Sequence, residues 1–101
     1  MPSNNPRYRR FKLRQDLRRK FARRGDVCGI CGKPIDYSLK VGDPSGMWYE
    51  LDEIVPISRG GSPYDEDNLQ SAHARCNRKK SNRLPSEMRP KDMACPVSRA
   101  W

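Results

Sequence analysis

The sequence predicts a small α+β domain that needs an additional covalent or metal link, and three observations lead to this fold class. The chain has 101 residues, 35% of them hydrophobic, and a mean hydropathy of −1.01. A core built from so few apolar residues gives little margin of stability, so an extra link is expected. A helical hydrophobic pattern, two strand-like segments and a second helical segment follow one another along the chain. Four cysteines could supply the link, as disulfides or as metal ligands.

The first predicted element is a helix over residues 9–24. Leu13, Leu17 and Phe21 recur every four residues and form a narrow apolar stripe, with basic residues around the rest of the helix. Gly25 follows as a stop signal, because glycine adopts the left-handed conformation that often ends a helix. A basic amphipathic helix is therefore expected at the start of the domain.

Positive charge is concentrated in this N-terminal part. Residues 7–24 contain ten Lys and Arg against the single acid Asp16, which accounts for the whole formal net charge of +9. Such a cluster is typical of a surface that binds a polyanion, most often nucleic acid, although a solvated helix face has the same composition. Few aromatic or long apolar side chains accompany the charges, so an anionic membrane is a minor alternative.

The first ten residues, MPSNNPRYRR, are polar and basic. They lack the apolar stretch of a signal peptide or a membrane span, so we expect a cytoplasmic protein. Cysteines in a reducing compartment more often bind metal than form disulfides. A metal site is accordingly favoured as the link.

A strand, a second short strand and a helix are predicted after the GDPSG turn. Residues 48–55 are strand-like and end at Pro56. A short strand is expected near residues 68–70, followed by a helix over residues 71–82 with Ser71 as a candidate N-cap. The expected organisation is a disordered N-terminus over residues 1–8, one domain over residues 9–83 that includes the basic helix, and an extended tail over residues 84–101.

Two pairs of metal-ligating residues have the spacing of a zinc site. Cys28 and Cys31 are separated by two residues, and after 41 intervening residues His73 and Cys76 have the same separation. Tetrahedral zinc is bound by such sets, in which each pair clamps one edge and the chain between them becomes a closed loop. Cys95 could instead complete a four-cysteine site and release His73 for another role, but it lacks a partner at this spacing. We expect structural Zn²⁺ at the first four residues and a free thiol at Cys95.

The adjacent acids Asp52 and Glu53 lie in an apolar segment of this basic chain. Burying an ionised carboxylate costs several kcal/mol unless a partner compensates the charge. A regular strand would point these two side chains to opposite faces, but a strand that twists or ends near Pro56 could bring both to one site. Asp52 and Asn77 carry the hard oxygen ligands that suit Mg²⁺ or Mn²⁺ rather than zinc.

Four segments together carry a family resemblance. CGIC, LDEIVPISRGG, DNLQ and HARCNRKKS occur in this order within residues 28–81. The sequence resembles the HNH endonucleases, which have a zinc-stapled ββα-metal (His-Me finger) fold. The resemblance implies a two-stranded hairpin packed on a helix that holds one divalent ion, and hydrolysis of phosphodiester bonds in DNA.

The resemblance also implies a role for individual residues. Asp52 matches the first metal ligand and Asn77 the last motif position, where the family has His or Asn. Asn68 matches the middle position, which fastens the hairpin loop and orients the base. The cysteine and histidine pairs match the structural zinc ligands Cys28, Cys31, His73 and Cys76.

Glu53 departs from the family pattern, because a water-activating histidine usually follows the aspartate. The only histidine of the chain, His73, is at a zinc position. A carboxylate is ionised at neutral pH and can accept a proton from water, although it is a weaker base than imidazole. Glu53 could therefore be the general base, or it could join Asp52 as a metal ligand and leave metal-bound hydroxide as the nucleophile.

The expected function is a metal-dependent DNA endonuclease or nickase with low intrinsic sequence specificity, because contacts to the phosphate backbone carry no sequence information. The alternative is a catalytically inactive, zinc-stabilised DNA-binding or adaptor module. We expect a monomer that binds no membrane, and resemblance to small phage-encoded HNH proteins suggests a role beside the terminase. The candidate DNA-binding residues are Arg18, Arg19, Arg59, Arg78, Lys79, Lys80 and Arg83.

Overall fold

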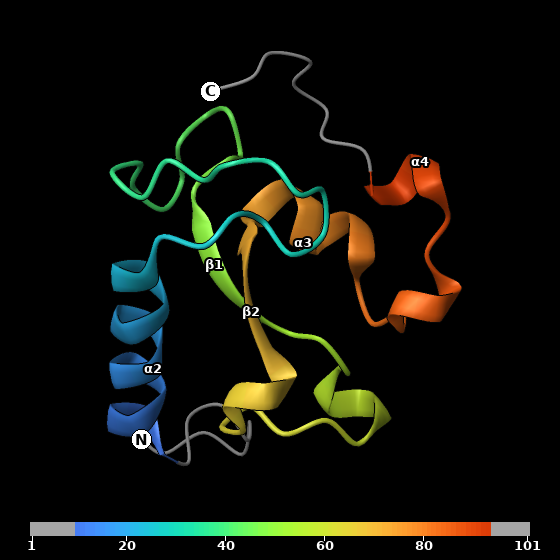
Figure 1. Ribbon diagram of the computed structural model, residues 1–101, viewed down its shortest axis with the longest axis horizontal. Helices are drawn as coiled ribbons and strands as arrows, with labels where there is room; N and C mark the ends of the chain where they lie inside the picture. The colour runs from blue at the N-terminus through green and yellow to red at the C-terminus, as the bar shows by residue number, and fades with distance from the viewer. Residues whose placement is uncertain (1–9, 94–101) are drawn as a thin grey trace.

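The computed structural model describes residues 10–93 of the chain, and Figure 1 shows how its elements are arranged. A two-stranded sheet lies between one long helix on one side and a short helix on the other. The fold is therefore α+β, as the sequence predicts. The helices and strands are α2 (Phe11–Arg24), β1 (Tyr49–Glu53), β2 (Leu69–His73), α3 (Ala74–Lys80) and α4 (Pro90–Met93).

Helix α2 has the apolar stripe that its sequence predicts. Leu17 and Phe21 are buried in the core, and Leu13 packs against it while partly exposed. Gly25 ends the helix in the left-handed conformation, with φ of 67°, and its N–H donates to the carbonyl of Ala22. Both the apolar face and the C-terminal stop predicted for this helix are confirmed.

Strands β1 and β2 form an antiparallel pair in which Tyr49 lies opposite His73 and Glu53 opposite Leu69. Tyr49 and Leu51 belong to the core cluster that includes the apolar stripe of α2. Since side chains alternate along a strand, Asp52 belongs to the other face of β1. The sheet thus has one side toward α2 and one toward α3.

The connection between the strands closes tightly at Gly61. A Cβ atom at this position would collide with the carbonyl of Val55 and approach the side-chain amide of Asn68. Only glycine leaves room for this approach of the two backbone segments. The second glycine of the SRGG segment is therefore required by the loop that follows β1.

The second helix differs from its predicted bounds. Residues 71–73 pair with β1, so the helix begins at Ala74 and His73 precedes it as N-cap, while Ser71 is buried within β2. The prediction of Ser71 as the N-cap is wrong. Hydrogen bonding to β1 satisfies the backbone of these residues and outweighs their local helical pattern.

The segment after α3 also differs from the extended chain expected from residue 84. Pro85–Glu87 form a 3-10 turn, and Pro90–Met93 form α4. Each begins with a proline at the first helical position, where its missing N–H has no cost. Met88, between them, packs against the core. Cys95, the closing SRAW and residues 1–8 lie outside the described residues.

The core joins α2, the segment between α2 and β1, both strands and α3. No helix within residues 10–93 is long and apolar enough to cross a membrane. The buried apolar residues come from α2, the segment over residues 28–48, both strands and α3. They are Leu17, Phe21, Cys28, Ile30, Ile35, Met47, Trp48, Tyr49, Leu51, Leu69, Ala72, Ala74 and Cys76.

Candidate functional site

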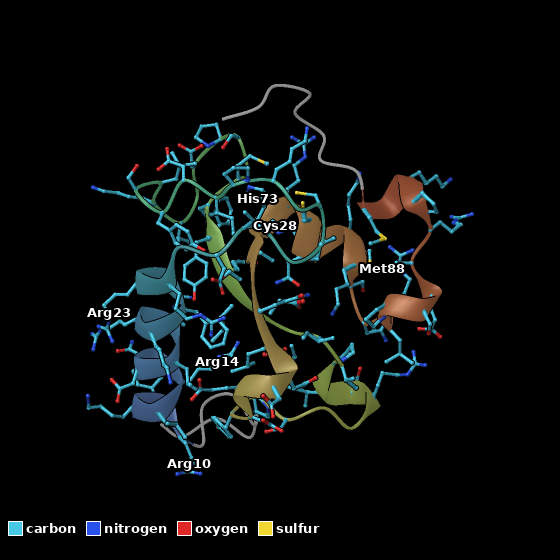
Figure 2. All side chains as sticks on the ribbon, viewed as in Figure 1. Arg10, Arg14, Arg23, Cys28, His73 and Met88 are labelled. Carbon is cyan, nitrogen blue, oxygen red and sulfur yellow. The ribbon has the colours of Figure 1, made fainter. Side chains whose placement is uncertain are left out.

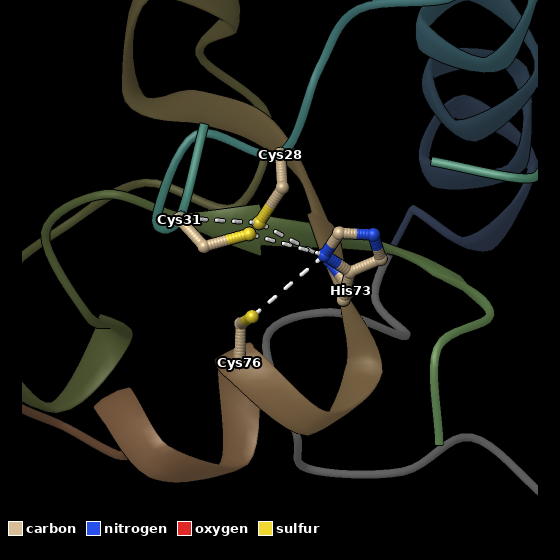
Figure 3. A group of neighbouring side chains, drawn as sticks. All are labelled: Cys28, Cys31, His73 and Cys76. Carbon is tan, nitrogen blue, oxygen red and sulfur yellow. Dashed lines mark hydrogen bonds between the residues drawn. The ribbon is translucent and has the colours of Figure 1, made fainter. Parts of the chain in front are cut away.

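The two predicted ligand pairs meet in one cluster, which Figure 3 shows at close range. Cys28 and Cys31 come from the loop after α2, whereas His73 ends β2 and Cys76 lies in α3. Their four candidate ligand atoms lie within 4.8 Å of one another. The cluster thereby joins the loop, the sheet and the helix at one point.

His73 presents its Nδ1 atom to the cysteines. This atom lies 3.4 Å from Sγ of Cys31 and 3.7 Å from Sγ of Cys76. The opposite ring atom, Nε2, lies 3.0 Å from the carbonyl oxygen of Pro34. A carbonyl accepts only from a protonated nitrogen, so this contact selects the tautomer with a free Nδ1 lone pair.

Among the three cysteines of the cluster, Cys28 is the one best stabilised as a thiolate. The thiol of Cys76 donates to it, and the N–H groups of Cys31 and His73 lie 3.5 Å from it, so the pKa of Cys28 is lowered to about 4. Burial raises the pKa of Cys31 to about 11, and donation to Cys28 raises the pKa of Cys76. Cys28 is therefore already a thiolate that can bind a metal, whereas Cys31 and Cys76 must each lose a proton to become ligands.

This donor set fits zinc. A zinc–nitrogen bond of about 2.05 Å and a zinc–sulfur bond of about 2.3 Å in a tetrahedron separate nitrogen from sulfur by about 3.6 Å. This separation is close to the 3.4 and 3.7 Å found between Nδ1 of His73 and the sulfurs of Cys31 and Cys76. Three sulfurs and one imidazole are a common structural zinc set, and no disulfide uses these cysteines, which are all free. Cys28, Cys31, His73 and Cys76 form a zinc-binding group.

The acidic pair divides between the two faces of the sheet. Asp52 and Glu53 are both 4% exposed. Glu53 faces α2, where it contacts Arg14, whereas Asp52 faces α3, where it contacts Lys80. The strand remains regular at this point, so the two carboxylates do not converge within the described structure.

Both carboxylate oxygens of Asp52 have partners in the protein. Nε2 of Gln70 donates to Oδ2 at 2.9 Å, and Nζ of Lys80 lies 3.4 Å from Oδ1. Lys80 also donates to the carbonyl of Glu53 at 2.8 Å. Burial raises the pKa of Asp52, and the contacts with Gln70 and Lys80 oppose this effect only in part.

Glu53 forms a buried ion pair with the first helix. Its Oε2 atom lies 2.8 Å from a guanidinium nitrogen of Arg14. That guanidinium also donates to the carbonyl of Leu51 at 2.9 Å and to the carbonyl of Pro63 at 2.7 Å. The compensating partner that a buried carboxylate needs is therefore an arginine of α2.

Asn77 contacts a third acid of β1. Its Nδ2 atom donates to Oε1 of Glu50 at 3.0 Å. Glu50, Glu53 and Asn77 line a cavity of about 520 Å³, which Arg14 and Arg18 of α2 also line. Carboxylates, an amide and guanidinium groups thus line one space, so it contains groups suited to a cation and groups suited to an anion.

Asn68 closes the loop between the strands. Its side-chain oxygen accepts from the N–H of Val55 at 2.9 Å. Its Nδ2 atom donates to the carbonyls of Val55 and Ser62 at 3.1 and 3.0 Å. These three bonds hold the chain just beyond Glu53, at the position where the resemblance assigns a loop-fastening residue.

The position of Lys80 contradicts one prediction made from the sequence. It was expected to lie along DNA, but its side chain is 2% exposed and is bound to Asp52. The reason is its spacing: Lys80 lies one helical turn after the buried Cys76 and therefore shares its face. The remaining basic positions of α3 lie on the outside, where Lys79 is exposed and Arg78 stacks over the Trp48 ring at 5.1 Å.

The other predicted DNA-binding residues are placed differently from one another. Arg59 forms a paired contact with both carboxylate oxygens of Glu87, at 3.1 and 3.2 Å. Arg83 donates to backbone carbonyls at the end of α3. Arg18 contacts the ring of Tyr49, and Arg19 is exposed on the outside of α2 near Asp16. Of these four arginines, Arg18 lines the cavity.

Three residues of the site were missed from the sequence: Arg14 and Gln70, which contact the acidic pair, and Glu50, which contacts Asn77. Arg14 lies three residues before Leu17, so helical spacing places it beside the apolar stripe, where an arginine needs an acceptor. Glu50 and Gln70 were detectable from strand alternation and register, since Glu50 shares a face with Asp52 and Gln70 lies opposite Asp52.

The fold and the site together define a small zinc-stapled ββα domain. Among curated proteins, none matches the chain. A family model described as HNH endonuclease matches residues 28–83, which is more than half of the chain. The chain belongs to the HNH endonuclease family, and the matched segment is a nuclease-type domain that contains the zinc group, both strands and α3.

Proposed function

We propose that this protein is a metal-dependent DNA endonuclease or nickase. The observation that carries the proposal is the cavity between β1 and α2, which Glu53 and Asn77 line together with Arg18 within a domain of nuclease type. A phosphodiester needs positive charge around its oxygens and a carboxylate that can take a proton from water. This space offers both at one place.

Asp52 and Asn77 are the proposed ligands of Mg²⁺ or Mn²⁺. Their oxygen atoms suit these ions, and each carboxylate oxygen retains a lone pair beyond its present hydrogen bond. When bound, such an ion supplies electrostatic stabilisation of the phosphate and of the leaving 3′-oxygen. Binding at Asp52 competes with the Lys80 ammonium, which now occupies Oδ1.

Glu53 is the proposed general base. Its carboxylate is held at the cavity by Arg14, so its orientation is fixed before substrate arrives. It accepts a proton from the attacking water as the oxygen–phosphorus bond forms, and the 3′-oxygen leaves from the opposite side. The imidazole that the family usually has at this position would perform the same proton transfer.

Exposed bases carry the proposed contacts to DNA. Lys79, Arg78 and Arg19 are exposed and Arg18 lines the cavity, so they can meet phosphate groups. Contacts of this kind read charge rather than base sequence, and binding should weaken steeply with salt. We propose low sequence specificity and, from the resemblance to small phage HNH proteins, a role beside a phage terminase.

A second candidate function is a DNA-binding or adaptor module without catalysis. Two ion pairs favour it: Asp52 and Glu53 are both neutralised by buried cations of the protein, Lys80 and Arg14. A site in this state resists a divalent ion unless the ion displaces Lys80. The two functions differ in whether DNA is cut.

Nicking of supercoiled plasmid by the zinc-loaded protein, with Mg²⁺ or Mn²⁺, separates the two functions. We expect nicking by the wild type and a loss of at least about 10²-fold in Asp52→Ala, since one charged stabilising group is removed. Asp16→Ala is the matched control, because it removes an exposed acid from α2 and should retain full activity. Wild-type protein that binds DNA but nicks no faster than Asp52→Ala overturns the nuclease and leaves the adaptor.

A further inference from the structure

Helix α2 lies outside the segment that the HNH model matches, yet one of its side chains reaches the site. The matched segment begins at Cys28, and α2 ends at Arg24. Figure 2 shows Arg14 directed from α2 toward the strands and Arg23 directed away from the molecule. The two arginines therefore differ in environment while sharing a helix and a charge.

Arg14 is fixed by three acceptors from different parts of the fold. It binds Oε2 of Glu53 at 2.8 Å, together with two backbone carbonyls, those of Leu51 in β1 and Pro63 in the loop. Only 9% of the surface of Arg14 is accessible to solvent, whereas Arg23 is exposed. Burying an arginine costs desolvation free energy. Hydrogen bonds and an ion pair offset this cost only when the donors of the planar guanidinium meet acceptors in a defined geometry.

The Arg14 contact gives a physical reason for the glutamate at position 53. A guanidinium offers only donors, so it binds a carboxylate and has no acceptor in a protonated imidazole. A histidine at this position would carry no negative charge to compensate Arg14, and on taking a proton from water it would place a second positive charge beside the guanidinium. Arg14 and Glu53 are therefore matched to each other.

We propose that Arg14 is a positioning residue of the cleavage site, which holds the Glu53 carboxylate at the cavity and makes α2 part of the active site. This inference rests on the proposed nuclease function. It assigns to the protein an interdependent Arg14–Glu53 pair in place of the single histidine that is usual in the family. Glu53 performs the proton transfer, and Arg14 acts through it.

The test is plasmid nicking by the zinc-loaded full chain in four variants: Arg14→Gln, Glu53→His, the double variant, and Arg23→Gln as control. We expect Arg14→Gln to lower kcat about 10²-fold at unchanged KM for DNA, because the base is misplaced while the DNA contacts remain. Glu53→His should be about as slow. The double variant should be at least about 10-fold faster than Glu53→His, since imidazole no longer faces a guanidinium.

The rescue separates positioning from a structural role. A merely structural Arg14 makes the double variant slower than either single variant, whereas an interdependent pair makes it faster than Glu53→His. Zinc content and thermal melting of each variant show that the compared proteins are folded. Equal kcat in Arg14→Gln and Arg23→Gln overturns the positioning role, and so does a double variant no faster than Glu53→His. A wild type that does not nick overturns the nuclease function itself.

Discussion

Nζ of Lys80 lies 3.4 Å from Oδ1 of Asp52, and both side chains are buried. The Lys80 ammonium thus contacts the Asp52 carboxylate, which the resemblance to HNH endonucleases assigns as a ligand of a divalent ion. Lys80 comes from α3 and Asp52 from β1, so the pair also joins the helix to the sheet. The stability of the hairpin and the proposed binding of a divalent ion at Asp52 therefore both depend on this pair.

The first prediction concerns stability. Asp52→Asn should lower the free energy of unfolding by about 3–5 kcal/mol, because it leaves the Lys80 charge buried without its partner. Asp52→Asn with Lys80→Met should recover most of this loss, since both charges are then absent. Urea unfolding of the zinc-loaded proteins measures both changes. Additive effects of the two substitutions would show that the pair is not coupled.

The second prediction concerns divalent ions. Lys80→Met should increase the affinity for Mn²⁺ about 10-fold or more, because Asp52 loses the internal cation that competes for its oxygen. Calorimetric titration of the zinc-loaded protein with Mn²⁺ measures the affinity without reference to DNA cleavage. Lys79→Met is the control, since Lys79 is exposed and contacts neither acid. An unchanged affinity in Lys80→Met contradicts a cation site at Asp52.

The third prediction concerns the pH dependence of zinc binding. In the metal-free protein near pH 7, Cys28 is a thiolate because its pKa is about 4, whereas Cys31, with a pKa of about 11, is protonated. The pKa of Cys76 is also raised. Zinc should therefore release about two thiol protons, and its affinity should rise about 100-fold per pH unit. Calorimetry in buffers of different ionisation enthalpy counts these protons, and a release of three contradicts the low pKa of Cys28.

The fourth prediction identifies the zinc ligands. His73→Ala should lose the metal, because its Nδ1 atom is one of only four donors in the described cluster. Cys95→Ser should retain one zinc per chain. Metal analysis of the purified variants gives the stoichiometry. Loss of zinc in Cys95→Ser with retention in His73→Ala would assign the site to four cysteines.

The fifth prediction concerns the loop beside the acids. Asn68→Ala should lower the free energy of unfolding by about 2–3 kcal/mol, since it leaves the N–H of Val55 and two carbonyls without their partner. Asn82→Ala, at an exposed position, should change it little. Thermal unfolding compares the two variants, and equal destabilisation contradicts the role of Asn68 in closing the loop.

The zinc group and the basic helix were predictable because their signals are local. Pairs of ligands two residues apart specify a knuckle, and the stripe of Leu13, Leu17 and Phe21 specifies which face of α2 is buried. The start of α3 was not predictable in this way. Strand pairing with β1 extends β2 to His73, and no local pattern at Ser71 reports that long-range pairing.

The partners of the acids depend on contacts between distant segments. Arg14 and Glu53 are far apart in sequence, and only the packing of α2 on β1 brings them together. Helical spacing was a signal that Arg14 and Lys80 lie on the buried sides of their helices, but the prediction did not use it for either residue. Spacing also does not indicate which carboxylate each side chain contacts. The three-dimensional register of the hairpin supplies that information.

Cleavage of supercoiled plasmid under single-turnover conditions tests the central claim most directly. The zinc-loaded wild type, with Mg²⁺ or Mn²⁺, is compared with Asn77→Ala and with an exposed control, Asn82→Ala. The account predicts nicking by the wild type and the control that stops when the divalent ion is chelated, with Asn77→Ala slower by at least about 10²-fold. Equal rates in all three proteins, or no nicking by any of them, would contradict it.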